Sequence, residues 1–192
     1  MDLERVDKIT TGAVGEPGER TFFLQARLGE RTVTIGVEKE QVELLASSIL
    51  EILATLDLET GEGPPGADLE LEPPLEPLWR AGRLSIGYAE DRDLMILEIE
   101  ELLPESLVPE EEGGGGEADE DDEDEETEAI LDGPQPDRLR IWASREQMLA
   151  LSTHGSEVAA RGRPRCQFCG NPIGPDGHVC TAMNGHRPSS GA

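Results

Sequence analysis

An acidic run near the middle of the chain places the strongest limit on what this sequence can fold into. Residues 110–128 read EEEGGGGEADEDDEDEETE and contain thirteen carboxylates, no basic residue and almost no apolar surface. Mutual repulsion opposes compaction, and nothing here can be buried to offset the entropy lost on ordering. We therefore expect a flexible acidic insert, so the fold must come from the residues on either side.

Charge and composition limit the function. The 192-residue chain has a formal net charge of −26 at pH 7, and the acidic run carries half of it. Hydrophobic residues make up 36% and aromatic residues 3%, which predicts a modest core. Such a charge repels phosphate backbones and anionic membranes, so binding to nucleic acid or to a membrane is disfavoured unless a local basic patch provides it.

Two further features concern organisation and location. Residues 59–77 read ETGEGPPGADLELEPPLEP, and this mixture of proline, glycine and acid predicts a second flexible acidic insert. The first residues, MDLERVDK, lack the apolar stretch of a signal peptide, and no apolar run approaches the roughly 20 residues that span a bilayer. We expect a cytoplasmic protein.

The first half of the chain shows strand and helix patterns in succession. Residues 20–27 and 31–37 favour two strands joined by a turn, and residues 8–14 favour another strand before them. A helix is predicted over residues 39–55. Its apolar stripe consists of Val42, Leu45, Ile49 and Ile52.

The second half repeats this order. Residues 79–88 and 94–102 predict a hairpin around the turn at 90–93, and residues 138–143 predict a strand. Ser144 then stands at a helix N-cap position with Gln147 three residues later, which is the spacing of a capping box.

The two halves align with each other. When Glu40-Gln41 is placed on Glu146-Gln147, the preceding strands and the apolar positions of both helices coincide. Few residues are identical, so duplication and a chance likeness of strand-turn-helix units both remain open. Either way we predict an α+β fold, with a two-layer antiparallel sheet covered on one face by two helices. This body would span residues 1–162, followed by a small knuckle over residues 163–188.

All three cysteines lie in one short stretch, CQFCGNPIGPDGHVC at 166–180. Three thiols cannot all pair in disulfides within one chain, and Cys166-x2-Cys169 is the spacing of zinc knuckles and ribbons. A loop rich in glycine and proline separates this pair from His178 and Cys180. The residues predict a structural zinc held by three cysteines and one histidine, with either His178 or His186 as the fourth ligand.

The chain resembles the uncharacterised, actinobacterial-type "domain of unknown function 3090" family over most of its length. The resemblance is carried by GAVGEPGERTFFLQAR at 12–27, EKEQVELLA at 38–46, the strands between 79 and 100, and AARGRPRCQFCGNPIGPDGHVCTAMNGHR at 159–187. The family's last motif reads approximately CPxCGxPLDPEGHxCPRxNGYR. The resemblance implies the ligand set Cys166, Cys169, His178 and Cys180.

The departures from this motif are few. His186 stands where the family has a tyrosine, which favours His178 as the ligand. Gln167 and Thr181-Ala182 also differ from the motif without removing a ligand. The resemblance supplies no activity. It associates the family with a phosphoinositide-kinase-like protein and a histidine-phosphatase-like protein, which we take as candidate partners.

Our leading hypothesis is a non-catalytic, zinc-binding adaptor or accessory protein with a protein partner and an unassigned oligomeric state. Asp176 is expected to be a turn residue, Phe168 to pack beneath the metal, and His154 to lie at the surface or at a helix end. The alternatives are a redox pair formed by Cys166 and Cys169, a catalytic metal, and an enzyme with a site between the two halves. A further alternative is a nucleic-acid or phosphate binder that uses Arg161, Arg163, Arg165 and Arg187.

Overall fold

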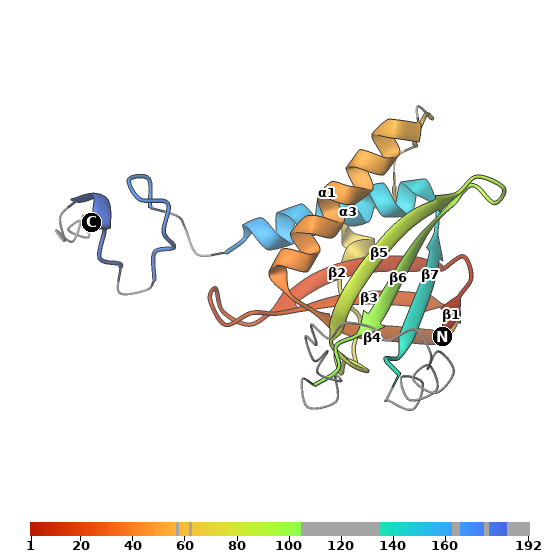
Figure 1. Cartoon of the computed structure of the whole chain (residues 1–192), viewed down its shortest axis with the longest axis horizontal. Coiled ribbons are helices and arrows are strands. Elements are labelled where there is room, and N and C mark those ends of the chain that lie inside the picture. The colour runs from red at the N-terminus through yellow and green to blue at the C-terminus, as the bar shows by residue number, and fades with distance from the viewer. Residues whose placement is uncertain (57, 62, 105–134, 163–165, 175–176, 184–192) are drawn as a thin grey trace, which may run out of the picture.

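The computed structural model describes residues 1–56, 58–61, 63–104, 135–162, 166–174 and 177–183. The body consists of two units, each a run of three antiparallel strands followed by one helix (Figure 1). Unit 1 contains β2 (Lys8–Val14), β3 (Thr21–Leu28), β4 (Arg31–Val37) and α1 (Lys39–Leu56). Unit 2 contains β5 (Ala81–Ala89), β6 (Leu94–Glu101), β7 (Arg138–Ala143) and α3 (Arg145–Ala160).

The predicted α+β class is confirmed, but the structure divides the expected single sheet into two. Unit 1 forms a three-stranded antiparallel sheet in the order β2-β3-β4. Unit 2 forms a four-stranded mixed sheet in the order β1-β7-β6-β5, in which β1 (Asp2–Leu3) runs parallel to β7. The sequence pattern does not reveal β1, because two residues are too short to show alternation.

The two sheets meet at one corner. The backbone N–H of Gly36 donates to the carbonyl of Trp79 at 3.0 Å, and the N–H of Leu78 donates to the carbonyl of Thr34 at 2.9 Å. Residues 78–80 therefore lie alongside β4 in the parallel sense, as β1 lies alongside β7. The sheet of unit 2 is thus bordered by β1, which precedes the first strand of unit 1. The sheet of unit 1 is bordered by residues 78–80, which precede the first strand of unit 2.

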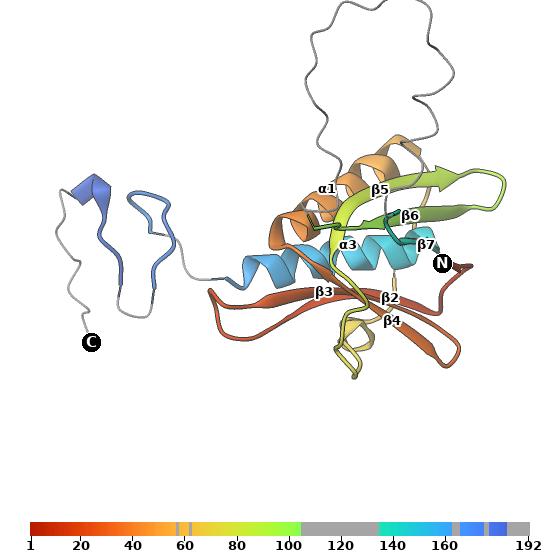
Figure 2. The ribbon, with the colours of Figure 1, turned by 60° about the horizontal axis from the view of Figure 1, so that its bottom comes forward.

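The two helices lie between the sheets and pack against each other (Figure 2). Helix α3 covers β2, and α1 contacts β5. The hydroxyl of Ser152 donates to the carbonyl of Ala46 at 2.7 Å, and both residues are buried. Gly155 permits this close approach, because a Cβ there would stand 3.2 Å from Thr11 Cγ2 and 3.3 Å from Val42 Cγ1. Both sheets and both helices thus contribute to one core.

The predicted N-cap of the second helix is confirmed. The backbone N–H of Gln147 donates to Ser144 Oγ at 3.2 Å, and the Ser144 N–H donates to Gln147 Oε1 at 2.9 Å. This reciprocal pair satisfies two backbone donors that a helix start leaves without partners.

Within residues 59–77, which composition predicts to be a flexible insert, residues 69–72 lie against the strands of unit 1. Leu69, at the end of η1 (Gly66–Leu69), is only 4% exposed. Lys8 Nζ donates to the carbonyl of Glu70 at 2.6 Å and to a carboxylate oxygen of Glu72 at 2.8 Å. Alternating leucine and glutamate lets the segment bury apolar side chains while its acids reach a cation.

Two other expectations bear on the fold. The acidic insert at 110–128 lies outside the described residues. In the part of the chain that the structure describes, no helix is long and apolar enough to cross a bilayer.

Candidate metal centre

Two tight turns build the knuckle, by which we mean the described residues from Cys166 to Met183. In the first turn the Gly170 N–H donates to the carbonyl of Cys166 at 2.8 Å, and the Cys166 N–H donates to the carbonyl of Asn171 at 2.8 Å. Gly170 takes a φ of +72°, which favours glycine because it has no Cβ. This turn directs Cys166 and Cys169 to the same side.

The second turn reverses the chain. The Gly177 N–H donates to the carbonyl of Gly174 at 2.9 Å, and Gly177 has a φ of +80°. The chain then returns through His178 and Cys180, and the short helix η4 (Thr181–Met183) follows. Two pairs of candidate ligands, with eight residues between them in the sequence, therefore face each other.

The structure brings together Cys166, Cys169, His178 and Cys180. Their ligand atoms all lie within 4.8 Å of one another. The sulfur atoms of Cys166 and Cys180 are 3.8 Å apart, and Cys169 Sγ is 3.2 Å from His178 Nε2. These four residues could hold a metal ion.

One of these distances has the value expected for zinc. With Zn–S bonds of about 2.3 Å, two sulfur ligands at the corners of a tetrahedron stand about 3.8 Å apart. The Cys166–Cys180 separation has that value. It is far too long for a disulfide, whose S–S bond is about 2.0 Å, and all three thiols are free of disulfides.

The environment of Cys166 favours its thiolate. The Phe168 N–H points at Cys166 Sγ from 3.5 Å and, with help from the Cys169 N–H, lowers the pKa of the Cys166 thiol to about 6. Cys166 is 6% exposed and Cys180 is fully buried. Thiolate is the form in which cysteine binds metal. The donor set therefore suits a zinc ion in charge and in softness, and its Cys166–Cys180 distance is that of a tetrahedral site.

The other residues singled out in the sequence fall elsewhere. Asp176, His186 and the arginines at 163, 165 and 187 lie outside the described residues. Arg161 forms an exposed ion pair with Glu157 at 3.5 Å. His154 is half-buried on α3 and lies six residues before the end of that helix.

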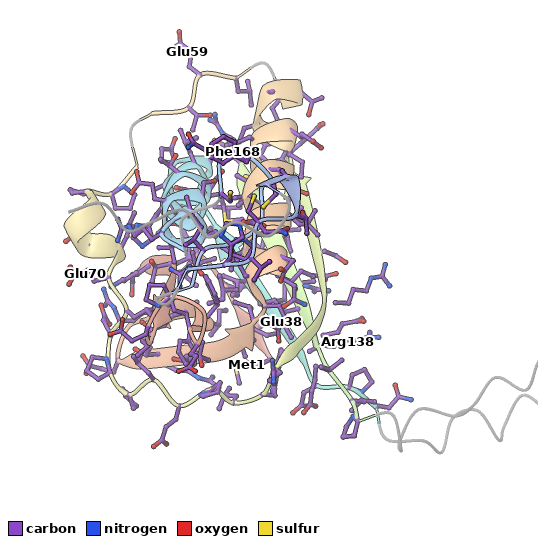
Figure 3. All side chains as sticks on the ribbon, turned by 90° about the vertical axis from the view of Figure 1, so that its left-hand side faces the viewer. Met1, Glu38, Glu59, Glu70, Arg138 and Phe168 are labelled. Atoms are coloured by element: carbon purple, nitrogen blue, oxygen red, sulfur yellow. The ribbon has the colours of Figure 1, made fainter. Side chains whose placement is uncertain are left out.

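Phe168 does not pack beneath the cluster as the sequence suggested. Its side chain is 56% exposed at the outside of the knuckle (Figure 3). Its backbone N–H rather than its ring serves the cluster, because the tight turn directs that N–H at a sulfur. Val179, between two of the candidate ligands, is 66% exposed. The knuckle therefore presents apolar side chains to solvent.

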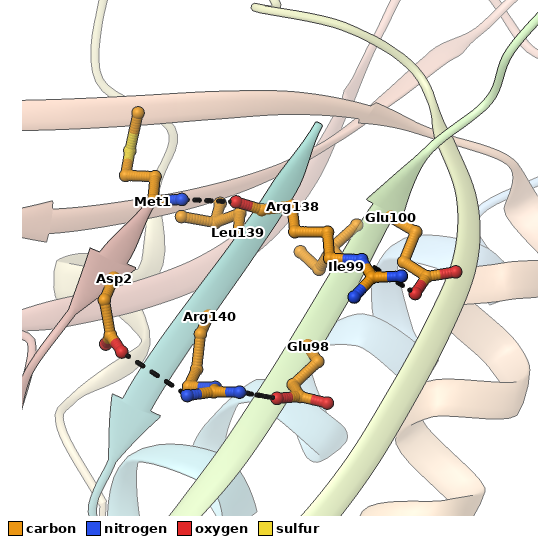
Figure 4. Close-up of a pocket in the computed structure, with 8 residues that line it drawn as sticks. All are labelled: Met1, Asp2, Glu98, Ile99, Glu100, Arg138, Leu139 and Arg140. Atoms are coloured by element: carbon orange, nitrogen blue, oxygen red, sulfur yellow. Dashed lines mark hydrogen bonds and ion pairs between the residues drawn. The ribbon is translucent and has the colours of Figure 1, made fainter. Parts of the chain in front are cut away.

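A cavity of about 380 Å³ lies over the outer face of the four-stranded sheet (Figure 4). Arg140 bonds to Glu98 at 2.7 Å and lies 3.7 Å from Asp2, and Arg138 pairs with Glu100 at 3.2 Å. Because each of these charges already has an opposite partner, the cavity is a poor candidate for an ionic ligand.

Sequence patterns missed a second feature, a groove between α1 and β5. This α1/β5 groove has a volume of about 310 Å³ and is lined by Gln41, Leu44, Leu45, Ser48 and residues 82–86. The available signal was Leu44, which lies off the apolar stripe of α1 and is 67% exposed. A large leucine left in solvent beside an edge strand indicates a surface that can bind something else.

Comparison with known proteins adds the family. Neither the curated proteins nor the solved structures include a match to this chain. The family model described as "Protein of unknown function (DUF3090)" matches residues 1–180. The match covers both units of the body and all four candidate ligands, as the resemblance of the sequence motifs predicts. The chain therefore belongs to the DUF3090 family.

Proposed function

We propose that this protein is a non-catalytic, cytoplasmic zinc-binding adaptor. Cys166, Cys169, His178 and Cys180 would hold one structural zinc ion. The observation that carries this proposal is the convergence of three sulfur atoms and one imidazole nitrogen within 4.8 Å. Three cysteines and one histidine form a closed set for zinc, which leaves no coordination position for a substrate.

The adaptor role is supported by what the knuckle exposes. Phe168 and Val179 flank the candidate ligands and are 56% and 66% exposed. A zinc ion would hold these apolar side chains in place on a segment too short to build its own core. We propose a protein partner, and the kinase-like and phosphatase-like proteins associated with the family are the first to test.

The metal is tested by elemental analysis of protein purified without chelator under reducing conditions. One zinc per chain is expected. His178→Ala and Cys180→Ser should lose most of it, while His186→Ala should retain it and serves as the matched histidine control. Protein without zinc, or zinc lost on the His186 change alone, would contradict the proposed ligand set.

The adaptor role is tested by calorimetric titration with each candidate partner. Phe168→Ser with Val179→Ser should keep the zinc and lose the partner, because these side chains lie outside the metal shell. Leu58→Ser, which alters an exposed leucine of the body, is the control and should bind normally. A partner that binds the double variant as well as the unaltered protein would show that the knuckle is not the contact surface.

A further inference from the structure

The two units permit a residue-by-residue comparison of their sheets. Thr11 pairs with Leu24, which pairs with Ile35. In unit 2 Ile86 pairs with Leu97, which pairs with Ile141, and Ile141 aligns with Ile35. Thr11 therefore corresponds to Ile86.

This register relates three residues of β2 to three of β5. Lys8, Thr10 and Gly12 correspond to Arg83, Ser85 and Gly87. Each set contains a cation, a hydroxyl and a glycine in the same order along the strand.

In unit 1 all three residues bind the chain's own residues 69–72, Leu-Glu-Leu-Glu. Lys8 donates to the carbonyl of Glu70 and to the carboxylate of Glu72. The Thr10 hydroxyl donates to the carbonyl of Leu69. The Leu71 side chain fills the space over Gly12, where an added Cβ would come within 2.6 Å of it. The strand thus binds this segment through a charge, a hydroxyl and the shape of its surface.

In unit 2 the matching positions are open. A Cβ added at Gly87 meets no atom of the described chain within 4 Å. Leu44 of α1 corresponds to Ala150 of α3. Gly63 lies against Ala150 so closely that a Cβ added at Gly63 would stand 2.6 Å from the Ala150 Cβ. Leu44 itself is 67% exposed at the α1/β5 groove. The chemistry that binds a segment in unit 1 is thus repeated in unit 2 beside an apolar groove.

We propose that the α1/β5 groove, with the adjoining face of β5, binds an extended segment of a partner protein in which leucine and glutamate alternate. The charge of Arg83 complements the glutamates, and β5 is an edge strand whose backbone can pair with an extended chain. This inference rests on the proposed adaptor function and gives it a second contact surface, on the body.

One difference between the two units limits where a bound segment can lie. Gln25 bonds to both the carbonyl and the N–H of Glu72, each at 2.8 Å. Glu98 stands at the corresponding position and accepts a bond from Arg140 at 2.7 Å. A carboxylate cannot donate to a backbone carbonyl, so the bound segment would follow the groove and β5 without crossing onto β6.

A peptide taken from the chain itself tests this. The peptide GPPGADLELEPP, residues 63–74, is labelled with fluorescein and titrated with the full chain by fluorescence anisotropy. We expect saturable binding that Arg83→Glu weakens about tenfold, because a charge-assisted bond is lost. Gly87→Val should weaken it similarly, by filling the space for a leucine. Arg31→Glu, at an exposed arginine of β4, is the matched control and should bind normally.

Several results would contradict the groove proposal. A peptide that does not bind, or binds equally well to the Arg83 and Gly87 variants, overturns the proposal. Self-association seen by sedimentation and abolished by Arg83→Glu would assign the groove to a second copy and also overturn it. So would peptide binding that appears only after residues 110–128 are deleted, because the groove would then serve the chain's own insert.

Zinc content separates this inference from the function on which it rests. If the zinc-loaded protein does not bind the peptide, the groove proposal is contradicted and the proposed zinc-binding adaptor is not. If the protein binds the peptide but holds no zinc, the groove proposal is supported and the zinc-binding function is contradicted.

Discussion

Gln41 and Gln147 occupy corresponding positions in α1 and α3, and each attaches its helix to the other unit. Gln41 Oε1 accepts the backbone N–H of Glu38 at 2.8 Å. Its Nε2 donates to the carbonyls of Ala81 and Gly82, at 3.1 and 3.0 Å, where β5 begins.

Gln147 repeats this arrangement from the other side. Its Oε1 accepts the N–H of Ser144, and its Nε2 donates to the carbonyls of Val6 and Asp7, at 2.9 and 3.1 Å, just before β2. One side chain thus caps a helix and joins the two units at the same time.

Replacing this side chain should cost stability. Gln147→Ala removes the capping bond and leaves two carbonyls without their donor, so we expect a loss of about 1–2 kcal/mol in the free energy of unfolding. Urea unfolding followed by circular dichroism measures it. Thr153→Ala, exposed on the same helix, is the control and should change stability by less than about 0.5 kcal/mol. Equal effects of the two changes would contradict the joining role.

Leu69 tests whether residues 63–77 are part of the folded body. Because its side chain is 4% exposed, Leu69→Ala should lower the unfolding free energy by about 2–3 kcal/mol. Leu58→Ala removes the same atoms from a side chain that is 48% exposed and should have little effect. If the two variants unfold at the same urea concentration, the segment does not contribute to the core.

Gly155 lies where α3 approaches both β2 and α1. A Cβ there meets Thr11 and Val42 at 3.2 and 3.3 Å, so a larger side chain must displace them. We expect Gly155→Val to cost about 1–3 kcal/mol through overpacking, measured by thermal unfolding. Ser156→Val, at the exposed neighbouring position, carries the same β-branched side chain and should be far milder. A Gly155 variant as stable as the Ser156 variant would rule out a tight crossing.

His154 should make stability depend on pH. Burial disfavours its charged form, Arg161 adds repulsion, and together they lower the pKa of His154 below 6.5, although Glu157 and Glu70 oppose the shift. The unfolded chain therefore takes up the proton first. The contribution of His154 to stability is fully present above about pH 6.5 and is lost as the pH falls from there through its folded-state pKa.

The variant His154→Gln isolates this contribution. When the pH is lowered from about 7 to about 5, the urea midpoint of the unaltered protein should decrease. The midpoint of the variant should decrease less, because the linked proton is gone. The same midpoint drop in both proteins would show that carboxylates, not this imidazole, account for the pH dependence.

Removal of the proposed zinc should affect the knuckle and spare the body. The core cluster extends from Leu3 to Val158 and includes no residue of the knuckle. Chelation is therefore expected to leave the urea midpoint of the body unchanged. Hydrogen exchange should rise at the amides of Cys166 and Gly170, whose bonds depend on the turn. A lowered body midpoint on chelation would reveal contacts between the knuckle and the core.

Most of the individual elements can be predicted from the sequence, because their patterns are local. The alternation in residues 31–37 marks β4 without error, and the pair Ser144 and Gln147 marks the start of α3. The division into two sheets depends on which edges pair at a distance, such as Gly36 with residues 78–80. No local period reports such pairing. Composition also does not reveal that Leu69 and Leu71, within residues 59–77, pack on the surface of the body.

The candidate site divides in the same way. The spacing of Cys166 and Cys169 and the loop that follows are enough to predict a cluster, since such turns are short-range. The exposure of Phe168 is not predictable, because it depends on which side of a tight turn faces the sulfur atoms. The α1/β5 groove lies between elements that are distant in the sequence, and its local signal is Leu44, which lies off the apolar stripe of α1. The kind of segment that we propose for it follows only from comparing unit 2 with the occupied face of unit 1.

The segments that border the two sheets have a further consequence. Since β1 runs beside β7 and residues 78–80 run beside β4, each half finishes the sheet of its counterpart. The two units thus exchange bordering segments within one polypeptide. Separate halves would therefore each present an incomplete sheet, and we expect that they would fold only by finding each other. Because both units share one core, we expect them to unfold together as one cooperative unit.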